Sequence, residues 1–437
     1  MRDFPIQTGL TILVAGVLVA FVNPPDTKQW DAMGPLSPLA RHVEPLPPAP
    51  PPFRVPTIGK KADAIGALLD DNDGVLDAFY GALRRRDSVT RIVHYGDSPT
   101  TADLITGDIR GLLQERFGDA GHGFLLPGKP WAWYQHTGVR LSGSGWQMVP
   151  ASHFEARDGL FGLGGVSLTG GTGASSKIVY EKTGYTRFEV WFLRQPEGGE
   201  FTLSAGDSVL GKVETAGESK AADFAAFTVP EAASELELRV TQGHVRVFGI
   251  TAENAGPGVV YDSLGLNGAS ITVLSRMFNP QHWAAELQHR RPNLVIINYG
   301  TNEADFAEFV DKQYEKELRE AIRRVKAALP GTSILIMSPM DRGYKSGPGQ
   351  IATMLTIPRI VDMQRRVARE TGCGFFDTFH AMGGDGTMAR WYTAQPRLVS
   401  ADFIHPNPAG GKLIATAFTR EIISGLNRYQ LRISTLR

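Results

Sequence analysis

Two rhythms of hydrophobic and polar positions run along the chain, and the first alternates short apolar runs with amphipathic stretches. The runs "RIVHY", "NLVIINYG", "SILIMS" and "GFFDT" are typical of buried strands. Before the third run, apolar residues recur every three or four positions at Leu318, Ile322, Val325 and Leu329, which predicts a helix with one buried face. Strands that alternate with such helices predict a parallel sheet covered on both faces, and therefore an α/β fold.

One long helix is predicted directly after the first of these strands. The stretch "TTADLITGDIRGLLQERFG" carries a row of apolar residues that would face inward, namely Leu104, Ile105, Ile109, Leu112 and Leu113. The strand and the helix together form the first strand–helix unit of the predicted sheet.

The second rhythm fills the middle of the chain. Between about Trp131 and Gly256, short alternating runs such as "TRFEVWFL", "EFTLSA", "ELELRVT" and "VRVFGIT" are separated by turn residues, which predicts an all-β sandwich or barrel. The simplest organisation is one α/β domain, made of residues 58–130 and 256–437, that is interrupted by an inserted β domain at residues 131–255.

The first 57 residues follow neither rhythm. Residues 4–25 carry no charge, but their strongly apolar part, residues 10–22, is shorter than the roughly 20 residues of a spanning helix. We therefore predict a signal anchor at residues 1–25; a cleaved signal peptide and a buried soluble helix are the alternatives. Six prolines between Pro45 and Pro52 make residues 26–57 a proline-rich linker. Either export reading predicts a periplasmic or extracellular protein, which the anchor would tether to the inner membrane.

Composition narrows the possible partners. Lys and Arg number 45, Asp and Glu also number 45, and this balance gives no reason to expect a nucleic-acid partner. With Cys373 as the single cysteine, no disulfide and no cysteine-based metal site can form within the chain. No other metal-ligand spacing is convincing, so no metal or cofactor is expected. Any contact with a membrane is expected only through the N-terminal segment.

The tripeptide Gly-Asp-Ser occurs twice, and the two copies lie in different surroundings. Ser98 follows a predicted strand and precedes a predicted helix, the place where doubly wound sheets carry their chemistry. Ser208 lies between two β runs, where Gly-Asp is ordinary turn chemistry. Ser98 is therefore the candidate nucleophile, and Pro99 suits the start of the helix behind it.

A serine nucleophile needs a base, an orienting group and donors for an oxyanion. Asp402 and His405 stand three positions apart in "SADFIHPNPAGG", close enough for the carboxylate to orient the imidazole. The alternative is an aspartate that caps the last helix beside a surface histidine. In "NYGTNEAD", Asn302 follows a strand, and in "DSLGLNGAS" the turn from Gly265 to Gly268 offers an accessible N–H.

These blocks together resemble the SGNH, or GDSL-type, hydrolase superfamily over roughly residues 88–128 and 256–426. The resemblance implies a three-layer α/β/α domain. It also implies that Ser98 is the nucleophile and first oxyanion donor, His405 the general base and Asp402 its partner. Gly268, rather than Gly265, and Asn302 would be the other donors. Two residues depart from the common pattern: Pro99 replaces a Leu or Ile, and Glu303 replaces an Asp after the block-three asparagine.

The inserted β region extends the resemblance. The stretches "GDAGHGF", "KPWAWYQH", "GLFGLGGVSL" and "VYDSLGLNGAS" are similar to those of bacterial peptidoglycan O-acetylesterases, which carry a carbohydrate-binding-type β domain of sandwich or jelly-roll kind. Four rings are candidates for stacking on sugars: Trp131, Trp133, Tyr134 and Trp146, of which the first three are the substrate-binding candidates. The alternative is that they fill the β-domain core or its interface with the catalytic domain.

The resemblance implies a serine esterase that removes O-acetyl groups from a cell-wall or extracellular polysaccharide, with peptidoglycan as the leading substrate. Three alternatives stay open at this stage. The same acyl-enzyme could pass acetate to a sugar as an O-acetyltransferase, the fold could be an inert glycan-binding protein, or the substrate could be a lipid ester.

Overall fold

Parallel strands form the centre of the molecule, as the first rhythm of the sequence predicts. The computed structural model describes residues 67–152, 158–181 and 184–435. Six parallel strands lie in the order β17-β14-β13-β2-β12-β3. Their bounds are β2 Val89–Gly96, β3 Asp119–Leu125, β12 Gly258–Gly265, β13 Leu294–Asn298, β14 Ser333–Met337 and β17 Gly374–Phe376. The short strand β1 (Leu69–Asp70) pairs antiparallel with β17 at the edge.

Strand order creates one point where the winding of the sheet reverses. Strand β2 is the first of the parallel strands in the chain, yet it lies between β12 and β13. The chain leaves β2 on one side toward β3 and later returns on the other side at β13. Crevices at such reversal points lie beyond the carboxyl ends of the strands and are the usual binding sites of α/β folds.

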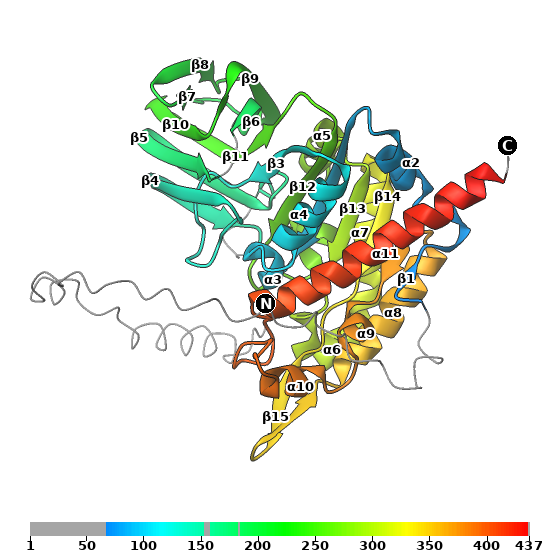
Figure 1. Cartoon of the computed structure of the whole chain (residues 1–437). Coiled ribbons are helices and arrows are strands. Elements are labelled where there is room, and N and C mark those ends of the chain that lie inside the picture. The colour runs from blue at the N-terminus through cyan, green and yellow to red at the C-terminus, as the bar shows by residue number, and fades with distance from the viewer. Residues whose placement is uncertain (1–66, 153–157, 182–183, 436–437) are drawn as a thin grey trace, which may run out of the picture. The chain divides into compact units, whose positions relative to one another are not determined.

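Helices cover both faces of the parallel strands (Figure 1). Helix α11 (Pro408–Ser434) contacts both α2 (Asp77–Arg85) and α4 (Thr106–Phe117) on one face. Helices α5 (Pro280–Arg290), α7 (Glu315–Ala328) and α8 (Thr356–Glu370) lie together on the other face. Neighbouring residues of β2 separate into two cores, Ile92 with the α2–α4–α11 side and Val93 with the α5–α7–α8 side. The three-layer arrangement is confirmed.

The long helix expected after Ser98 is wrong in one respect: it is two helices. Helix α3 spans Ser98–Thr101, and α4 begins only at Thr106. Between them Asp103 takes a left-handed φ of 54°. Its buried carboxylate accepts hydrogen bonds from Arg110 (2.6 Å), from the Thr106 hydroxyl (2.7 Å) and from the Thr137 N–H (2.8 Å). These bonds stabilise a break that the apolar periodicity does not reveal.

Antiparallel strands fill the middle of the chain, as the second rhythm predicts. They are β4 Val139–Pro150, β5 Val166–Tyr180, β6 Tyr185–Arg194, β7 Glu200–Ala205, β8 Ser208–Glu214, β9 Ala221–Ala233, β10 Glu235–Gln242 and β11 His244–Glu253. Figure 1 shows them as a lobe beside the parallel strands. Strand β11 also pairs antiparallel with β3, so the lobe continues the central sheet. The described residues form one compact unit, and the limits 131–255 of a separate β domain stay a prediction.

The predicted signal anchor at residues 1–25 and the proline-rich linker at residues 26–57 lie outside the described residues. Within the described part of the chain, no helix combines the length and the apolar character that crossing a bilayer requires.

Candidate active site

Ser98 stands at the carboxyl end of β2, at the reversal point of the sheet, and is half-buried. The first turn of α3 packs tightly over the strand ends. A Cβ at Gly96 would lie 2.2 Å from the Thr100 hydroxyl, and one at Gly265 would lie 2.0 Å from the Thr101 nitrogen. Glycine at both positions lets α3 approach β2 and β12 closely enough to hold Ser98 at this edge.

A continuous chain of hydrogen bonds joins Ser98 to the two other predicted residues. The Ser98 Oγ lies 2.7 Å from His405 Nε2, and His405 Nδ1 lies 2.7 Å from the Asp402 Oδ2. These are the contacts that a serine, a general base and an orienting carboxylate require. The structure thus brings together three residues that are separated by up to 307 positions in the sequence.

A tight turn fixes the orientation of Asp402. Its Oδ1 accepts hydrogen bonds from the N–H groups of Ile404 (2.9 Å) and His405 (3.1 Å), and Phe403, the next residue after Asp402, has a φ of 61°. The Phe403 carbonyl accepts a hydrogen bond from Gly343 N–H at 2.8 Å. Burial alone would raise the pKa of Asp402, but His405 and the two N–H groups together lower it to about 2. The carboxylate is therefore ionised at neutral pH.

The alternative role of Asp402 as a helix cap is wrong. The Asn407 side chain caps α11 by accepting a hydrogen bond from Gly410 N–H at 3.0 Å, and Pro408 occupies the first helical position. Asp402 is directed at His405 instead.

The glycine turn lies beside Ser98 at the end of β12. Leu266 N–H donates to the Gly96 carbonyl at 3.0 Å, which ties this turn to the end of β2. Gly265 is in close contact with α3, whereas Gly268 is exposed with a φ of 66° and its N–H donates to none of the described residues. A free N–H supports Gly268 over Gly265 as an oxyanion donor.

Asn302 reaches the same turn from the end of β13. Its Nδ2 donates to the Ala269 carbonyl at 2.8 Å, next to Gly268. One N–H of the side-chain amide is thereby used, and the second is free for another acceptor.

Glu303 connects the two loops that carry these donors, a role that the sequence does not predict. Its buried carboxylate accepts hydrogen bonds from Ile271 N–H (2.7 Å) and from Gly300 N–H (3.1 Å). Burial raises the pKa of Glu303 to about 7, although the hydrogen bonds from backbone N–H groups oppose that rise. In the sequence, the only indication of this role is that Glu303 directly follows Asn302.

Asp97 is the second buried carboxyl that sequence reasoning missed. It directly precedes Ser98 and is 3% exposed. Burial raises its pKa to about 6, and Thr301 and His405 act in the opposite direction. No described residue forms a hydrogen bond with its Oδ2. Asp97 does not replace Asp402, because the His405 Nδ1 is bonded to Asp402.

The second Gly-Asp-Ser copy is a hairpin turn, as predicted. Gly206 has a φ of 55°, and Ala205 and Ser208 pair across the turn between β7 and β8. Ser208 and Asp207 are both exposed, and neither forms a hydrogen bond with a histidine among the described residues.

The predicted aromatic platform divides into exposed and buried rings. Trp133 is 48% exposed and its Nε1 donates to the Asn267 side chain at 3.1 Å, beside the glycine turn. Trp131 is half-buried and packs edge-on against Tyr134. Tyr134 is buried, with its hydroxyl accepting a hydrogen bond from Leu126 N–H, so its ring cannot stack on a ligand. Trp146 packs in the β lobe.

Among the described residues, no group of three or more His, Cys, Asp or Glu side chains is arranged to hold a metal ion.

Residues at the carboxyl ends of the parallel strands match the model of a known protein family. The model of the GDSL-like lipase/acylhydrolase family matches residues 242–413, which include Gly268, Asn302, Asp402 and His405. The matched segment covers less than half of the chain and lies in its second part. The match leaves out Ser98, which the β lobe separates from the other family residues. The family match and the hydrogen-bonded chain from Ser98 through His405 to Asp402 together identify the protein as an enzyme of the SGNH hydrolase type.

Two relatives add detail. An acetylxylan esterase from Geobacillus stearothermophilus is 26% identical over 174 residues, which cover 38% of this chain and 73% of that protein. A solved structure described as a peptidoglycan O-acetylesterase in action aligns with a TM-score of 0.71 and 23% identity, over 83% of this chain and all of that chain. The second comparison shows that the two chains share their fold.

Proposed function

We propose that this enzyme is a serine esterase that removes O-acetyl groups from a cell-wall or extracellular polysaccharide, foremost peptidoglycan. The hydrogen-bonded chain from Ser98 through His405 to Asp402 is the observation that carries the proposal. The acetylxylan esterase and the peptidoglycan O-acetylesterase to which this chain is similar support an O-acetylated glycan as the substrate class.

The first half of the reaction forms an acetyl-enzyme. His405 Nε2 takes the proton of Ser98 as its Oγ attacks the acetyl carbonyl, and Asp402 stabilises the imidazolium that results. The N–H groups of Ser98 and Gly268 and the free amide N–H of Asn302 stabilise the oxyanion. His405 then protonates the sugar oxygen, which leaves as the free hydroxyl.

The second half returns Ser98. His405 takes a proton from water, whose oxygen attacks the acetyl carbonyl, and acetate leaves as Ser98 regains its proton. The side chains of His405 and Asp402 are 33% and 44% exposed, so water can reach the base. This exposure favours hydrolysis over transfer of the acetyl group to a second sugar.

The two Gly-Asp-Ser copies provide a matched test. We expect Ser98→Ala to lower kcat for acetate release by on the order of 10⁴-fold or more, and Ser208→Ala to leave it unchanged. Acetate released from O-acetylated peptidoglycan, acetylated xylan, acetylated alginate and an aryl acetate is the measurement. Transfer of labelled acetate to sugar oligomers is followed in the same reactions.

Each outcome has a clear meaning. Full activity of Ser98→Ala would contradict the nucleophile. Activity on the aryl acetate but on none of the three polysaccharides would contradict the glycan substrate, and transfer that exceeds release would replace the esterase by a transferase.

A further inference from the structure

A pocket of about 260 Å³ opens at the amino ends of the parallel strands, because its lining includes Arg91 near the start of β2 and Arg291 just before β13, whereas Ser98 lies at the carboxyl ends. Its walls come from β6 and β9 of the β lobe and from the last turn of α5. Arg91 in its lining lies in β2 seven positions before Ser98, a separation on the order of 20 Å along an extended chain. The pocket is therefore separate from the esterase site.

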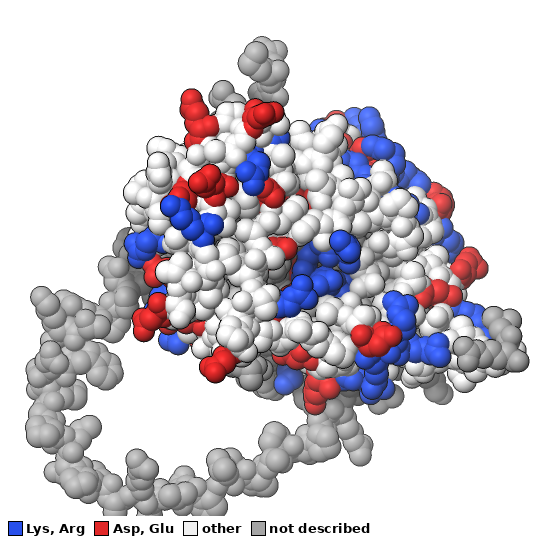
Figure 2. Space-filling view, turned by 90° about the horizontal axis from the view of Figure 1, so that it is seen from above, with Lys and Arg blue, Asp and Glu red and all other residues white. Residues whose placement is uncertain are grey.

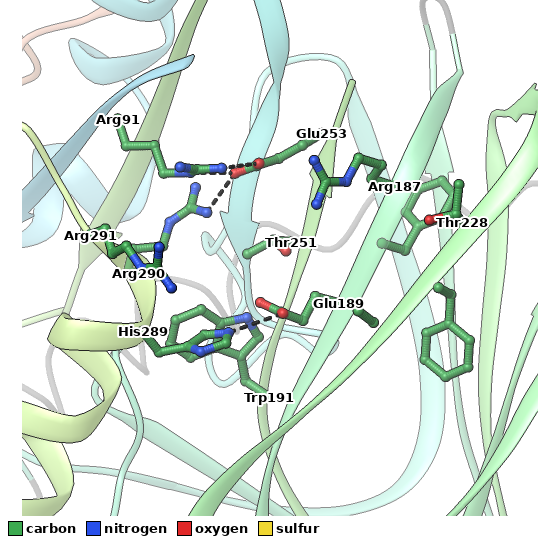
Figure 3. Close-up of a pocket in the computed structure, with 13 residues that line it drawn as sticks. Arg91, Arg187, Glu189, Trp191, Thr228, Thr251, Glu253, His289, Arg290 and Arg291 are labelled. Atoms are coloured by element: carbon green, nitrogen blue, oxygen red, sulfur yellow. Dashed lines mark hydrogen bonds and ion pairs between the residues drawn. The ribbon is translucent and has the colours of Figure 1, made fainter. Parts of the chain in front are cut away.

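The floor of the pocket carries Glu253, which is bonded to both Arg91 and Arg290 (Figure 3), and Asp262 lies behind it. Arg290 donates to Asp262 at 2.6 Å and 2.7 Å and to Glu253 at 2.5 Å. Arg91 donates to the same Glu253 at 2.6 Å and 3.0 Å. Burial alone would raise the pKa of Glu253, but the two arginines lower it to about 2. Two positive charges thus meet two negative charges, and the floor is neutral.

On one wall, too, a carboxylate is paired with a basic side chain. His289 Nε2 lies 3.0 Å from the Glu189 carboxylate, and the His289 ring stacks on Phe224 with a centroid separation of 3.5 Å. Glu253 and Glu189 are the two acidic side chains of the lining. Glu253 is paired with arginines and Glu189 with His289.

Two arginines of the pocket lining have no acidic partner among the described residues. Arg187 on β6 and Arg291 after α5 line the pocket from opposite walls, and neither forms an ion pair with any described residue. The buried Thr251 lies between them in Figure 3. Figure 2 looks onto this side of the molecule and shows basic side chains gathered around a hollow near its centre. Low-dielectric walls concentrate the field of such charges inside a hollow.

We propose that this pocket binds a compact oxyanion, a carboxylate or phosphate group, between the guanidinium groups of Arg187 and Arg291. Guanidinium groups bind both oxyanions through paired N–H donors, and the Thr251 hydroxyl adds a donor on the wall between them. Arg91 and Arg290 are held by Glu253 and Asp262, so these two arginines do not compete with Arg187 and Arg291 for the oxyanion.

Binding to the full-length protein tests this site. Isothermal titration calorimetry is run with inorganic phosphate and, separately, with oligogalacturonate, at low ionic strength. We expect Arg187→Gln/Arg291→Gln to weaken binding by about tenfold for each guanidinium removed. Binding of phosphate alone identifies a solute anion as the ligand, and binding of the oligosaccharide alone identifies carboxylates on a polymer.

Arg84→Gln/Arg85→Gln is the matched control, because it removes two exposed charges of α2 that do not line the pocket. Equal weakening in both double variants would overturn the proposal, since it would indicate attraction by the general surface charge. Absence of binding of either probe to the unmodified protein would overturn it as well. Ser98→Ala should bind like the unmodified protein, so the result is independent of the proposed esterase activity.

Discussion

Buried carboxylates lie toward both ends of the parallel strands, and the two ends stabilise them differently. At the carboxyl end, Glu303 is held by backbone N–H groups and Asp97 has one oxygen without a partner in the described chain, so burial raises both pKa values. Toward the amino end, Asp262 and Glu253 are held by Arg290 and Arg91.

The difference shows what each end can do. Arg290 and Arg91 lower the pKa of Glu253 to about 2, and the ion pairs of Arg290 join β11, β12 and α5. Burial outweighs the neighbouring groups at Asp97 and Glu303 and raises their pKa values to about 6 and about 7, so both carboxyl groups change protonation near neutral pH. The carboxyl end is therefore sensitive to pH near neutrality, while at the amino end Glu253 stays ionised there.

The largest effect is expected from Asp402→Asn at the carboxyl end. Asparagine can keep the contacts of Oδ1 with the two N–H groups, but its NH₂ group would face His405 Nδ1. The imidazole would then carry its proton on Nε2, facing Ser98, where it cannot act as a base. We expect kcat on an aryl acetate to fall by about 10²- to 10⁴-fold with an unchanged melting temperature.

A loss of less than tenfold in Asp402→Asn would contradict the orienting role. Asp207→Asn, in the exposed second Gly-Asp-Ser copy, is the control and should retain full activity.

At the amino end the expected effect is on stability instead. Arg290→Met leaves the buried Asp262 without its cation and Glu253 with Arg91 alone. Removing one partner of a buried ion pair costs about 3–5 kcal/mol of unfolding free energy, which urea denaturation measures. Arg323→Met breaks the exposed pair with Glu320 on α7 and should cost less than about 1 kcal/mol. Equal losses in the two variants would remove the distinction between a buried network and a surface pair.

The pH dependence of stability compares the two ends directly. Glu303 keeps its proton up to about pH 7 in the folded chain but only to about pH 4.5 in the unfolded chain, so it lowers the unfolding free energy as pH rises between these values. Glu253 loses its proton already at about pH 2 in the folded chain, so its contribution rises between pH 2 and 4.5.

Glu303→Gln isolates the carboxyl-end contribution. The decrease in unfolding free energy between pH 4.5 and 7 should become smaller, by up to about 1.4 kcal/mol for each unit by which the pKa is raised. Asp97 should leave a residual decrease of the same sign, because its pKa is raised to about 6. An unchanged slope in urea denaturation series at several pH values would contradict a buried protonated Glu303.

Sequence reasoning predicted the parts of this molecule that local pattern determines. Strand β2 is buried from Ile92 to Gly96 and Ser98 follows two residues after its end, so the sequence distinguishes the candidate nucleophile from Ser208. His405 and Asp402 were found because their spacing fits one turn. The family resemblance supplied the roles of Gly268 and Asn302.

Contacts between distant segments could not be predicted in the same way. The Arg290 network joins residues from α5, β11 and β12, and nothing in their local sequence indicates a partner. The break at Asp103 depends on Arg110 and Thr137, and an isolated left-handed φ leaves no periodic signal. The burial of Glu303 depends on which loops meet at the sheet edge.

The smallest effect concerns the exposed ring beside the glycine turn. Trp133 presents nearly half its surface to solvent while Asn267 holds its Nε1, so the indole is both accessible and oriented. If a sugar stacks on it, Trp133→Ala should raise KM for acetylated polysaccharide by about 2- to 10-fold and leave kinetics on an aryl acetate unchanged, because the small ester does not reach the ring. Trp146→Ala, in the β lobe, should alter neither KM. An equal rise for both substrates in Trp133→Ala would mean that the ring only supports the Gly268 turn, and the carboxyl end would then lack an identified sugar contact.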